Sequence, residues 1–348
     1  MSRNCSSLTN FSSHLFTSSE HCPEKQSIYS YTTSVAWSVT SILMALFGIA
    51  NNSILLIVTL RVRSLKSGSG YLLANLFLTH FLMSAITLPT AAAGVLINLR
   101  DIQITDYYCN ILQPINTILY VNLSWTEAGL AVNRYVAICR PRLYPAFRAK
   151  TTAYFTILLC WVISTGCTMP FVFGVCGSFR VIPRTNQCSV VYDGVRGQIL
   201  GQSVVYGPFC VVGCAILLIL RKVAELRLQI GDIHTSRNGP TNAGLRQIRR
   251  GLVLGRVLLA GFIGNLLCIV PISLVIMIFP LALGRLPVMV LVLRSVLAAV
   301  YVFIPLVFYA MNEDYRHSSR NLMLSMIGCH ANVAADRPVN SIPLQLLS

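Results

Sequence analysis

Five ionisable side chains stand inside long, mostly apolar stretches of this sequence, and they are the first candidates for chemistry. They are His80, Glu127, Arg134, Arg256 and Arg294. A charge in apolar surroundings is costly, so such a residue is a functional-site hypothesis by default. A long basic side chain can also reach from an apolar run to water. The alternative interpretation of Arg134 is that its guanidinium only extends to the membrane surface.

The sequence lacks the residue patterns that are typical of enzymes. It has no His/carboxylate cluster with metal-ligand spacing, no nucleophile elbow and no phosphate-binding loop. Its 12 cysteines contain no C-x-x-C pair, and several lie in apolar runs, where a thiol acts as a small hydrophobe. We therefore expect no enzymatic activity, no metal site and no cofactor.

The composition predicts that lipid surrounds the elements that position these residues. Hydrophobic residues make up 55% of the chain and charged residues 11%, against about 25% charged residues in soluble proteins. The net charge of +16 is divided among short clusters between apolar runs. A nucleic-acid site would need a continuous basic face, so we expect none.

Seven runs reach the length of about 20 residues that a membrane-spanning helix needs. They cover residues 35–60, 71–97, 110–139, 152–175, 199–220, 252–279 and 288–310. The third run is the least apolar. The sequence thus predicts an all-α membrane protein with a seven-transmembrane helix bundle over residues 35–310.

The charges between the runs predict which side faces the cytoplasm. One set of loops carries fourteen basic residues against Glu225 and Asp232, whereas the other set is nearly balanced. Basic loops stay inside the cell, so residues 1–34 are expected to be extracellular. That segment is polar, which predicts no cleavable signal peptide, and it has glycosylation sequons at Asn4 and Asn10. We expect a multi-pass protein of the plasma membrane.

The third run carries a cysteine at its outer end and an arginine at its inner end. Cys109 and Arg134 are 25 residues apart, about 37 Å along a helix, which is roughly one bilayer with its interfaces. In seven spans of this orientation, that spacing resembles the rhodopsin-like (class A) G-protein-coupled receptors. The resemblance implies a disulfide between Cys109 and Cys188 in the second outer loop, with two free thiols as the alternative.

Landmarks in the other runs resemble the same family over nearly the whole chain. Asn133-Arg134-Tyr135 is similar to the family's Asp/Glu-Arg-Tyr motif, which faces the G-protein cavity; the Asn is shared with melatonin and moody-like receptors, to which this chain has a faint likeness. Further matches are Asn52 with Gly48, Asn75-Leu76, Trp161, Pro170, Pro208, Cys268, Pro271 and Pro305. Residues 311–328 resemble the family's amphipathic helix on the membrane surface. Cys329 then stands at a common palmitoylation position, and the tail, 329–348, is expected to be disordered.

The departures from the family pattern lie at its switch positions. The sodium-binding Asp of helix 2 is His80, the helix 3 Ser is Leu123, and the tyrosines of helices 5 and 7 are Ile216 and Phe308. The helix 6 Phe and Trp are Asn265 and Ile269. Because the oxygen ligands are lost, we expect no sodium site. The residues left to form the helix switch are Cys268, Pro271, Pro305 and Phe308.

Glu127 is a charge that the family pattern does not contain. It lies seven residues before Arg134, two turns away on the same helix face. We expect Asn52, His80 and Glu127 to form a polar core in which Glu127 pairs with protonated His80, or hydrogen-bonds to it while neutral. Such a pair would be proton-sensitive. The alternative is that water bridges the two side chains.

Two residues of the outer half are candidates for the ligand pocket. Asn116 stands where amine receptors have an Asp, and Ala298 where opsins have the retinal lysine, so the resemblance implies neither a biogenic amine salt bridge nor retinal. Arg294 lies about three turns above Pro305, and its guanidinium suits a carboxylate or phosphate. An anionic ligand group is therefore expected; an internal pair of Arg294 with Asp101, Asp106 or Asp193 is equally open.

The resemblance implies a receptor that binds an extracellular ligand and activates a heterotrimeric G protein at its cytoplasmic face. Ligand binding would favour an outward movement of helices 5 and 6, and the basic loops would also attract anionic membrane lipids. One alternative is a receptor-fold protein that no longer couples to G protein and acts as a scavenger or interaction partner. A transporter is less favoured, since the sequence shows no internal repeat.

Overall fold

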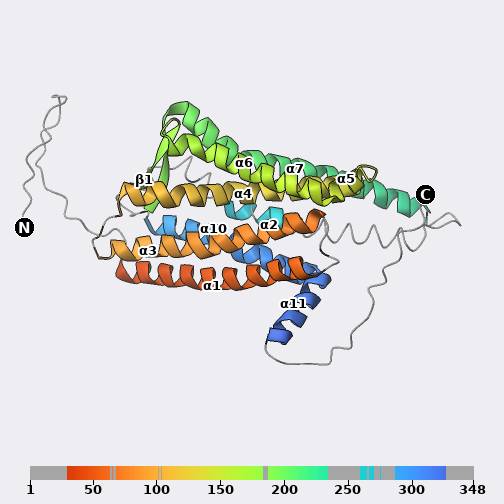
Figure 1. Cartoon of the computed structure of the whole chain (residues 1–348), viewed down its shortest axis with the longest axis horizontal. Coiled ribbons are helices and arrows are strands. Elements are labelled where there is room, and N and C mark those ends of the chain that lie inside the picture. The colour runs from red at the N-terminus through yellow and green to blue at the C-terminus, as the bar shows by residue number, and fades with distance from the viewer. Residues whose placement is uncertain are drawn as a thin grey trace, which may run out of the picture.

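Long helices run side by side in a bundle (Figure 1). The computed structural model describes residues 30–62, 65, 68–100, 102, 104–182, 187–233, 259–264, 266–269, 275 and 287–326. The elements are, in chain order, α1 (Tyr31–Arg61), α2 (Gly68–Leu82), the π-helical turn η2 (Met83–Thr87), α3 (Leu88–Asn98), α4 (Asp106–Cys139), α5 (Tyr144–Arg148), α6 (Lys150–Val172), β1 (Gly177–Ile182), β2 (Gln187–Tyr192), α7 (Gly194–Ile233), α10 (Pro287–Met311) and α11 (Glu313–Met326).

Five helical segments of the described residues are long and apolar enough to cross a membrane. They are Tyr31–Arg61, Gly68–Asn98, Lys150–Val172, Gly194–Glu225 and Val288–Met311. The third expected span, α4, has 34 residues but is less apolar, as its sequence predicts. Most of the expected span 252–279 lies outside the described residues, and so do Asn4, Asn10, Pro271 and Cys329.

The helices turn small and polar residues inward and large apolar residues outward. On α1 the buried face includes Ser34, Ser38 and Ser41, whereas Leu43 and Leu46 are 61% and 59% exposed. Water-soluble helices show the reverse pattern. Small inward residues let helices approach closely in lipid, and an apolar exterior of this kind needs a lipid solvent.

Gly48 marks one such close approach. A Cβ at this position would lie 2.4 Å from the Ser84 hydroxyl oxygen of η2. The turn η2 has its own local cause, because Pro89 lacks the N–H that an α-helix needs at that point. The Leu88 N–H instead bonds to the Met83 carbonyl, and the helix continues through a π-helical turn.

The helices α10 and α7 continue differently at the end of the bundle that the loop charges predict to be cytoplasmic, the inner end. After α10, the chain turns sharply into α11, which points away from the bundle axis (Figure 1). Its inward residues, Tyr315, Ser319 and Leu322, follow helical spacing, and its 14 residues lie within the predicted range 311–328. The 40-residue α7 is about 60 Å long. It passes the predicted end at residue 220 because the following segment has strong helix formers and no proline.

The outer end of the bundle carries a β-hairpin that the sequence pattern did not predict. Strands β1 and β2 pair antiparallel, with Val181 opposite Cys188. The Tyr192 ring packs edge-on against Phe171 at 5.8 Å, and burial raises the pKa of this phenol. The hairpin therefore has its own contacts with the end of α6.

Candidate functional site

The outer end of α4 is joined to the hairpin at two points. Cys109 and Cys188 form a disulfide with their Cα atoms 5.3 Å apart, and Cys109 is fully buried. One turn before it, the Asp106 carboxylate accepts a hydrogen bond from the Val181 N–H at 2.9 Å. The disulfide closes a loop of 79 residues, which in the chain-entropy treatment stabilises the fold by about 4.5 kcal/mol. The hairpin is thus fixed beside the outer mouth of the bundle.

The two candidate pocket residues lie on different helices in the outer half. Asn116 is half-buried on α4, and its Oδ1 accepts a hydrogen bond from the Thr87 hydroxyl at 2.8 Å. Arg294 is half-buried on α10, less than one turn from Leu291. The Leu291 carbonyl in turn accepts the Trp37 indole N–H at 2.9 Å, which places Arg294 near the level of the outer part of α1.

Hydrogen bonds between side chains connect α2, α4 and α6 in the middle of the bundle. The Asn75 amide donates to the Thr126 hydroxyl at 2.8 Å and accepts the Trp161 indole N–H at 3.1 Å. One turn further outward, the Asn122 amide donates to the Thr79 hydroxyl at 2.9 Å. Side-chain hydrogen bonds of this kind hold membrane helices together where water cannot compete.

The expected pair of His80 and Glu127 is not formed, and this prediction was wrong. His80 is fully buried, its ring lies 5.9 Å from the Tyr301 ring, and neither ring nitrogen has a hydrogen-bond partner among the described residues. The reason is the register of the two helices, because Thr126 lies level with Asn75 and Glu127 is therefore more than one turn from His80 along the bundle. The α4 face that meets α2 carries Asn122 and Thr126. Glu127, one position further, is half-buried near the Tyr120 phenol.

Asn52 and His80 both approach Tyr301, Asn52 at its backbone carbonyl and His80 at its ring. The Asn52 amide donates to the Gly48 carbonyl at 2.8 Å and to the Tyr301 carbonyl at 3.2 Å. The structure therefore brings α1, α2 and α10 together at a polar centre of Asn52, His80 and Tyr301. Glu127 belongs to a neighbouring face of α4.

At the inner end of α4, the triplet residues have separate partners. The Asn133 amide donates to the Phe147 carbonyl of α5 at 3.1 Å. Arg134 is 9% exposed, and the phenols of Tyr144 and Tyr315 lie near enough to its guanidinium to interact with it. Tyr135 packs against the second apolar cluster, in which Ala131 of α4 meets Ile216 of α7. The hydrogen bond of the neutral Asn133 to Phe147 thus holds α5, in the second inner loop, against the end of α4.

Phe308 belongs to a cluster of three aromatic rings that joins α2, α10 and α11. Its ring centroid lies 5.1 Å from that of Phe77 and 5.6 Å from that of Tyr315. Phe77 and Tyr315 are 6.0 Å apart, and all three pairs are edge-to-face. Such pairs are favourable beyond the area they bury. Of the other described switch residues, Pro305 is buried within α10 and Cys268 packs against the main apolar cluster.

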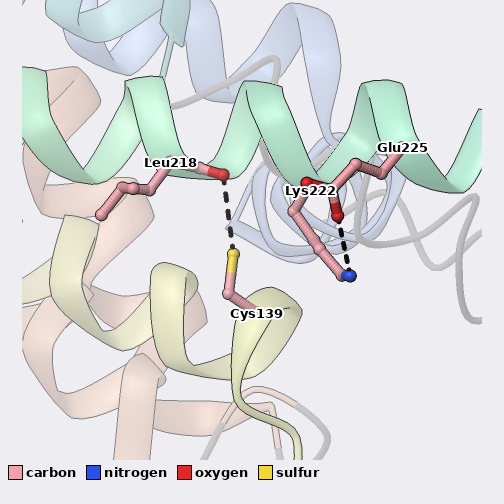
Figure 2. Close-up of polar contacts among 4 residues, drawn as sticks. All are labelled: Cys139, Leu218, Lys222 and Glu225. Carbon is pink, nitrogen blue, oxygen red and sulfur yellow. Dashed lines mark hydrogen bonds and ion pairs between the residues drawn. The ribbon is translucent and has the colours of Figure 1, made fainter.

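The inner ends of α4 and α7 also touch. The Cys139 thiol lies 3.8 Å from the Leu218 carbonyl oxygen, and one turn along α7 the Lys222 ammonium pairs with Glu225 at 3.0 Å, as Figure 2 shows. The ion pair stays within α7 and is exposed, so its contribution to stability is small. The thiol contact marks where α4 and α7 meet at the inner face.

Two inner residues with phenol groups were missed by sequence reasoning. Tyr315 follows Phe308 by seven residues and Tyr144 lies in the short α5 helix. A signal for Tyr315 existed, because residues 315, 319 and 322 have the spacing of one helix face. No local pattern indicated that Tyr144 approaches Arg134.

Comparison with known proteins adds an independent line of support. The family model that matches is described as 7 transmembrane receptor (rhodopsin family), and the match covers residues 51–312. Among similar proteins, 5-hydroxytryptamine receptor 7 of Xenopus laevis is 24% identical over 153 residues, which are 44% of this chain and 36% of that protein. Short-wave-sensitive opsin 1 of Homo sapiens is 30% identical over 149 residues, 41% of this chain and 40% of the opsin.

The similarity to these two relatives spans less than half of their own length. The fold likeness is broader. The crystal structure of squid rhodopsin matches with a TM-score of 0.72 over 86% of this chain and 88% of that chain, at 15% sequence identity. At that identity the likeness concerns the fold alone.

Proposed function

Because the chain belongs to the rhodopsin family of seven-transmembrane receptors, we propose that it binds an extracellular ligand in its outer half and activates a heterotrimeric G protein at its cytoplasmic face. The observation that carries this proposal is the continuity of α4. One uninterrupted helix leads from the disulfide at Cys109 to the buried Arg134. A movement at the outer end therefore has a rigid connection to the residue that would meet the G protein.

The inner face offers the surface that such a partner needs. Arg134 lies between α5 and α11, and the exposed basic residues Arg142 and Arg148 flank the second inner loop. A helix of the G protein would enter between the inner ends of the helices, as a helix in a groove. The basic loops support the proposal that this end is cytoplasmic and that the segment 1–34 is extracellular.

The ligand we propose carries an anionic group that Arg294 recognises. The family resemblance places Asn116 where amine receptors have an Asp and Ala298 where opsins have the retinal lysine, and this chain supplies neither a carboxylate nor an amine at those positions. The Asn116 Oδ1 accepts a hydrogen bond from the Thr87 hydroxyl, which favours a neutral hydrogen bond between Asn116 and the ligand. A guanidinium in the outer half of α10 favours a carboxylate or phosphate.

The test is G-protein activation in cells that express the chain with each Gα class in turn. Libraries of carboxylate- and phosphate-bearing metabolites and of peptides are applied, and Arg134→Ala is measured beside the wild type at matched surface expression. We expect activation by at least one compound that is lost in Arg134→Ala. Arg294→Ala should lose the response while Arg294→Lys keeps part of it. Silence with every Gα class would favour a receptor fold that no longer couples.

A further inference from the structure

The outer halves of α1 and α10 leave a groove between them. The groove encloses about 630 Å³ and runs along α1 from Thr32 to Met44 and along α10 from Val288 to Ala299. On the α10 side, Val288 and Val292 are 50% and 55% exposed. Because the chain belongs to a family of membrane-spanning receptors, this apolar surface faces lipid, and the molecule that fills the groove comes from the bilayer.

The polar side chains along the middle of the groove already donate their protons to backbone carbonyls. The Trp37 indole N–H donates to the Leu291 carbonyl at 2.9 Å. The Thr40 hydroxyl donates to the Ala36 carbonyl at 2.8 Å, and the Ser295 hydroxyl donates to the Leu291 carbonyl at 3.0 Å. The body of the occupant is therefore apolar, since a polar group placed here would exchange its hydrogen bonds with water for none.

Hydroxyl groups gather at the outer end of the groove. The Ser30 and Thr33 hydroxyls lie 2.9 Å apart at the exposed start of α1, and Thr32 lines the groove beside them. None of the described residues that line the groove is charged. The phosphate of a phospholipid would find no cation at this rim, whereas the single hydroxyl of a sterol can both donate to and accept from the two hydroxyls.

The groove has the length and the stiffness that a rigid occupant needs. Thr32 and Met44 are 12 residues apart, about 18 Å along the helix, which matches the roughly 15 Å of hydrocarbon in one leaflet. The lining includes the β-branched Val292 and Val296, which have few rotamers, and the flat Trp37 ring is fixed by its bond to α10. A preformed groove favours a rigid molecule, because a flexible acyl chain loses more conformational freedom on binding.

We propose that the groove between α1 and α10 binds a membrane sterol from the outer leaflet, with its hydroxyl at Ser30 and Thr33 and its rings against Trp37. Ala36 and Ala299 have the smallest side chains of the lining, and their size keeps the groove open for the rings. The sterol contacts both helices and so stabilises their packing at the outer end. The site lies on the lipid side of the bundle and depends neither on the proposed ligand nor on the G protein.

The test is photolabelling of the full-length chain in phosphatidylcholine nanodiscs that contain a diazirine derivative of cholesterol. Mass spectrometry then locates the label. We expect it on the peptides of residues 31–44 and 287–299 in excess over α6, which also faces lipid, with Leu158 61% exposed. Unlabelled cholesterol should compete for the label. Phosphatidylcholine that carries a diazirine on its acyl chain should label these peptides and α6 alike.

Two variants fill the groove, and one variant of the same helix controls for the substitution. Ala36→Leu and Ala299→Leu should each lower the cholesterol label about tenfold, the factor that corresponds to a steric clash of about 1.4 kcal/mol. Ala36 is exposed, so Ala36→Leu keeps the fold. Ala50→Leu places the same side chain on an exposed position of α1 outside the groove and should leave the label unchanged.

The second readout is the melting temperature in nanodiscs with and without cholesterol. Cholesterol should raise it by about 2–4 °C in the wild type and in Ala50→Leu, as a ligand that binds only the folded chain does, and should leave Ala36→Leu unchanged. Cholesterol label spread evenly over the lipid-facing helices overturns the proposal, and so does equal concentration of the phospholipid probe in the groove. Label in both Ala36→Leu and Ala299→Leu equal to that of the wild type also overturns it.

Discussion

The hydrogen bonds of Asn75 connect α2 to both α4 and α6, and their removal has a calculable effect. In Asn75→Leu the side-chain volume is nearly kept, so the change is mainly the loss of two bonds, to Thr126 at 2.8 Å and from Trp161 at 3.1 Å. Bonds between membrane helices contribute about 0.6 kcal/mol each. The indole N–H left without an acceptor adds about 1 kcal/mol. We expect a loss of about 2 kcal/mol in the free energy of unfolding.

The assay is unfolding by sodium dodecyl sulfate, followed by intrinsic fluorescence, of Asn75→Leu, Trp161→Phe and the double variant. Trp161→Phe removes the donor in advance, so Asn75→Leu should then cost only about 0.6 kcal/mol, the bond to Thr126, which gives a coupling of about 1.6 kcal/mol. Asn51→Leu is the control, because the Asn51 amide bonds to the Phe47 carbonyl within its own helix. Strictly additive effects at Asn75 and Trp161 would refute the claim that their bond holds α2 to α6.

Three further changes test other contacts. Cys109→Ser, Cys188→Ser and the double variant should lose the same stability, about 4 kcal/mol, because one bond is broken in each; unequal losses in thermal unfolding would contradict the disulfide. Asn133→Ala should speed hydrogen exchange over Tyr144–Arg148 several-fold, since the bond to the Phe147 carbonyl is lost, and protection equal to the wild type would exclude this contact. Gly48→Ala should lower the melting temperature because its Cβ meets the Ser84 hydroxyl at 2.4 Å. Adding Ser84→Gly should restore part of that loss, and no recovery would count against the close approach.

The membrane helices were predictable because their signal is local. An apolar run of about 20 residues needs no partner to be recognised, and the runs 35–60, 152–175 and 288–310 correspond to α1, α6 and α10. The span in α4 followed in the same way, whereas α11 was predicted from the family resemblance. The pairing of Cys109 with Cys188 came from the family resemblance, and the structure contains that disulfide.

The contacts between helices were not predictable because they depend on register and rotation. Glu127 follows Thr126, which lies level with Asn75, so Glu127 stands more than one turn from His80 along the bundle and also points about 100° away from Thr126. The π-helical turn before Pro89 adds a further rotation between α2 and α3. A linear sequence fixes neither the register nor the rotation of neighbouring helices, which is why Asn122 and Thr126 occupy the α2–α4 contact instead of Glu127.

The hairpin shows the same limit for loops. Its strands have no apolar alternation long enough to be recognised, and their pairing depends on the fixed end at Cys188. The partner of Asn133 is equally non-local, since it is a backbone carbonyl in a short helix that the sequence did not predict. In each case the missing information is a tertiary contact and not a local preference.

The two ends of α4 are secured by interactions of different strength, and this difference favours motion at one end. The outer end has a covalent bond, which contributes about 4.5 kcal/mol, together with the bond of Asp106 to the hairpin. The inner end has neutral contacts, the Asn133 amide to a carbonyl and the Cys139 thiol 3.8 Å from Leu218, each on the order of 1 kcal/mol. Under the same force the inner contacts separate first, because a hydrogen bond parts easily whereas the covalent bond at the outer end stays intact. A ligand that strains the outer half would therefore produce its largest displacement around Arg134, where the proposed partner binds.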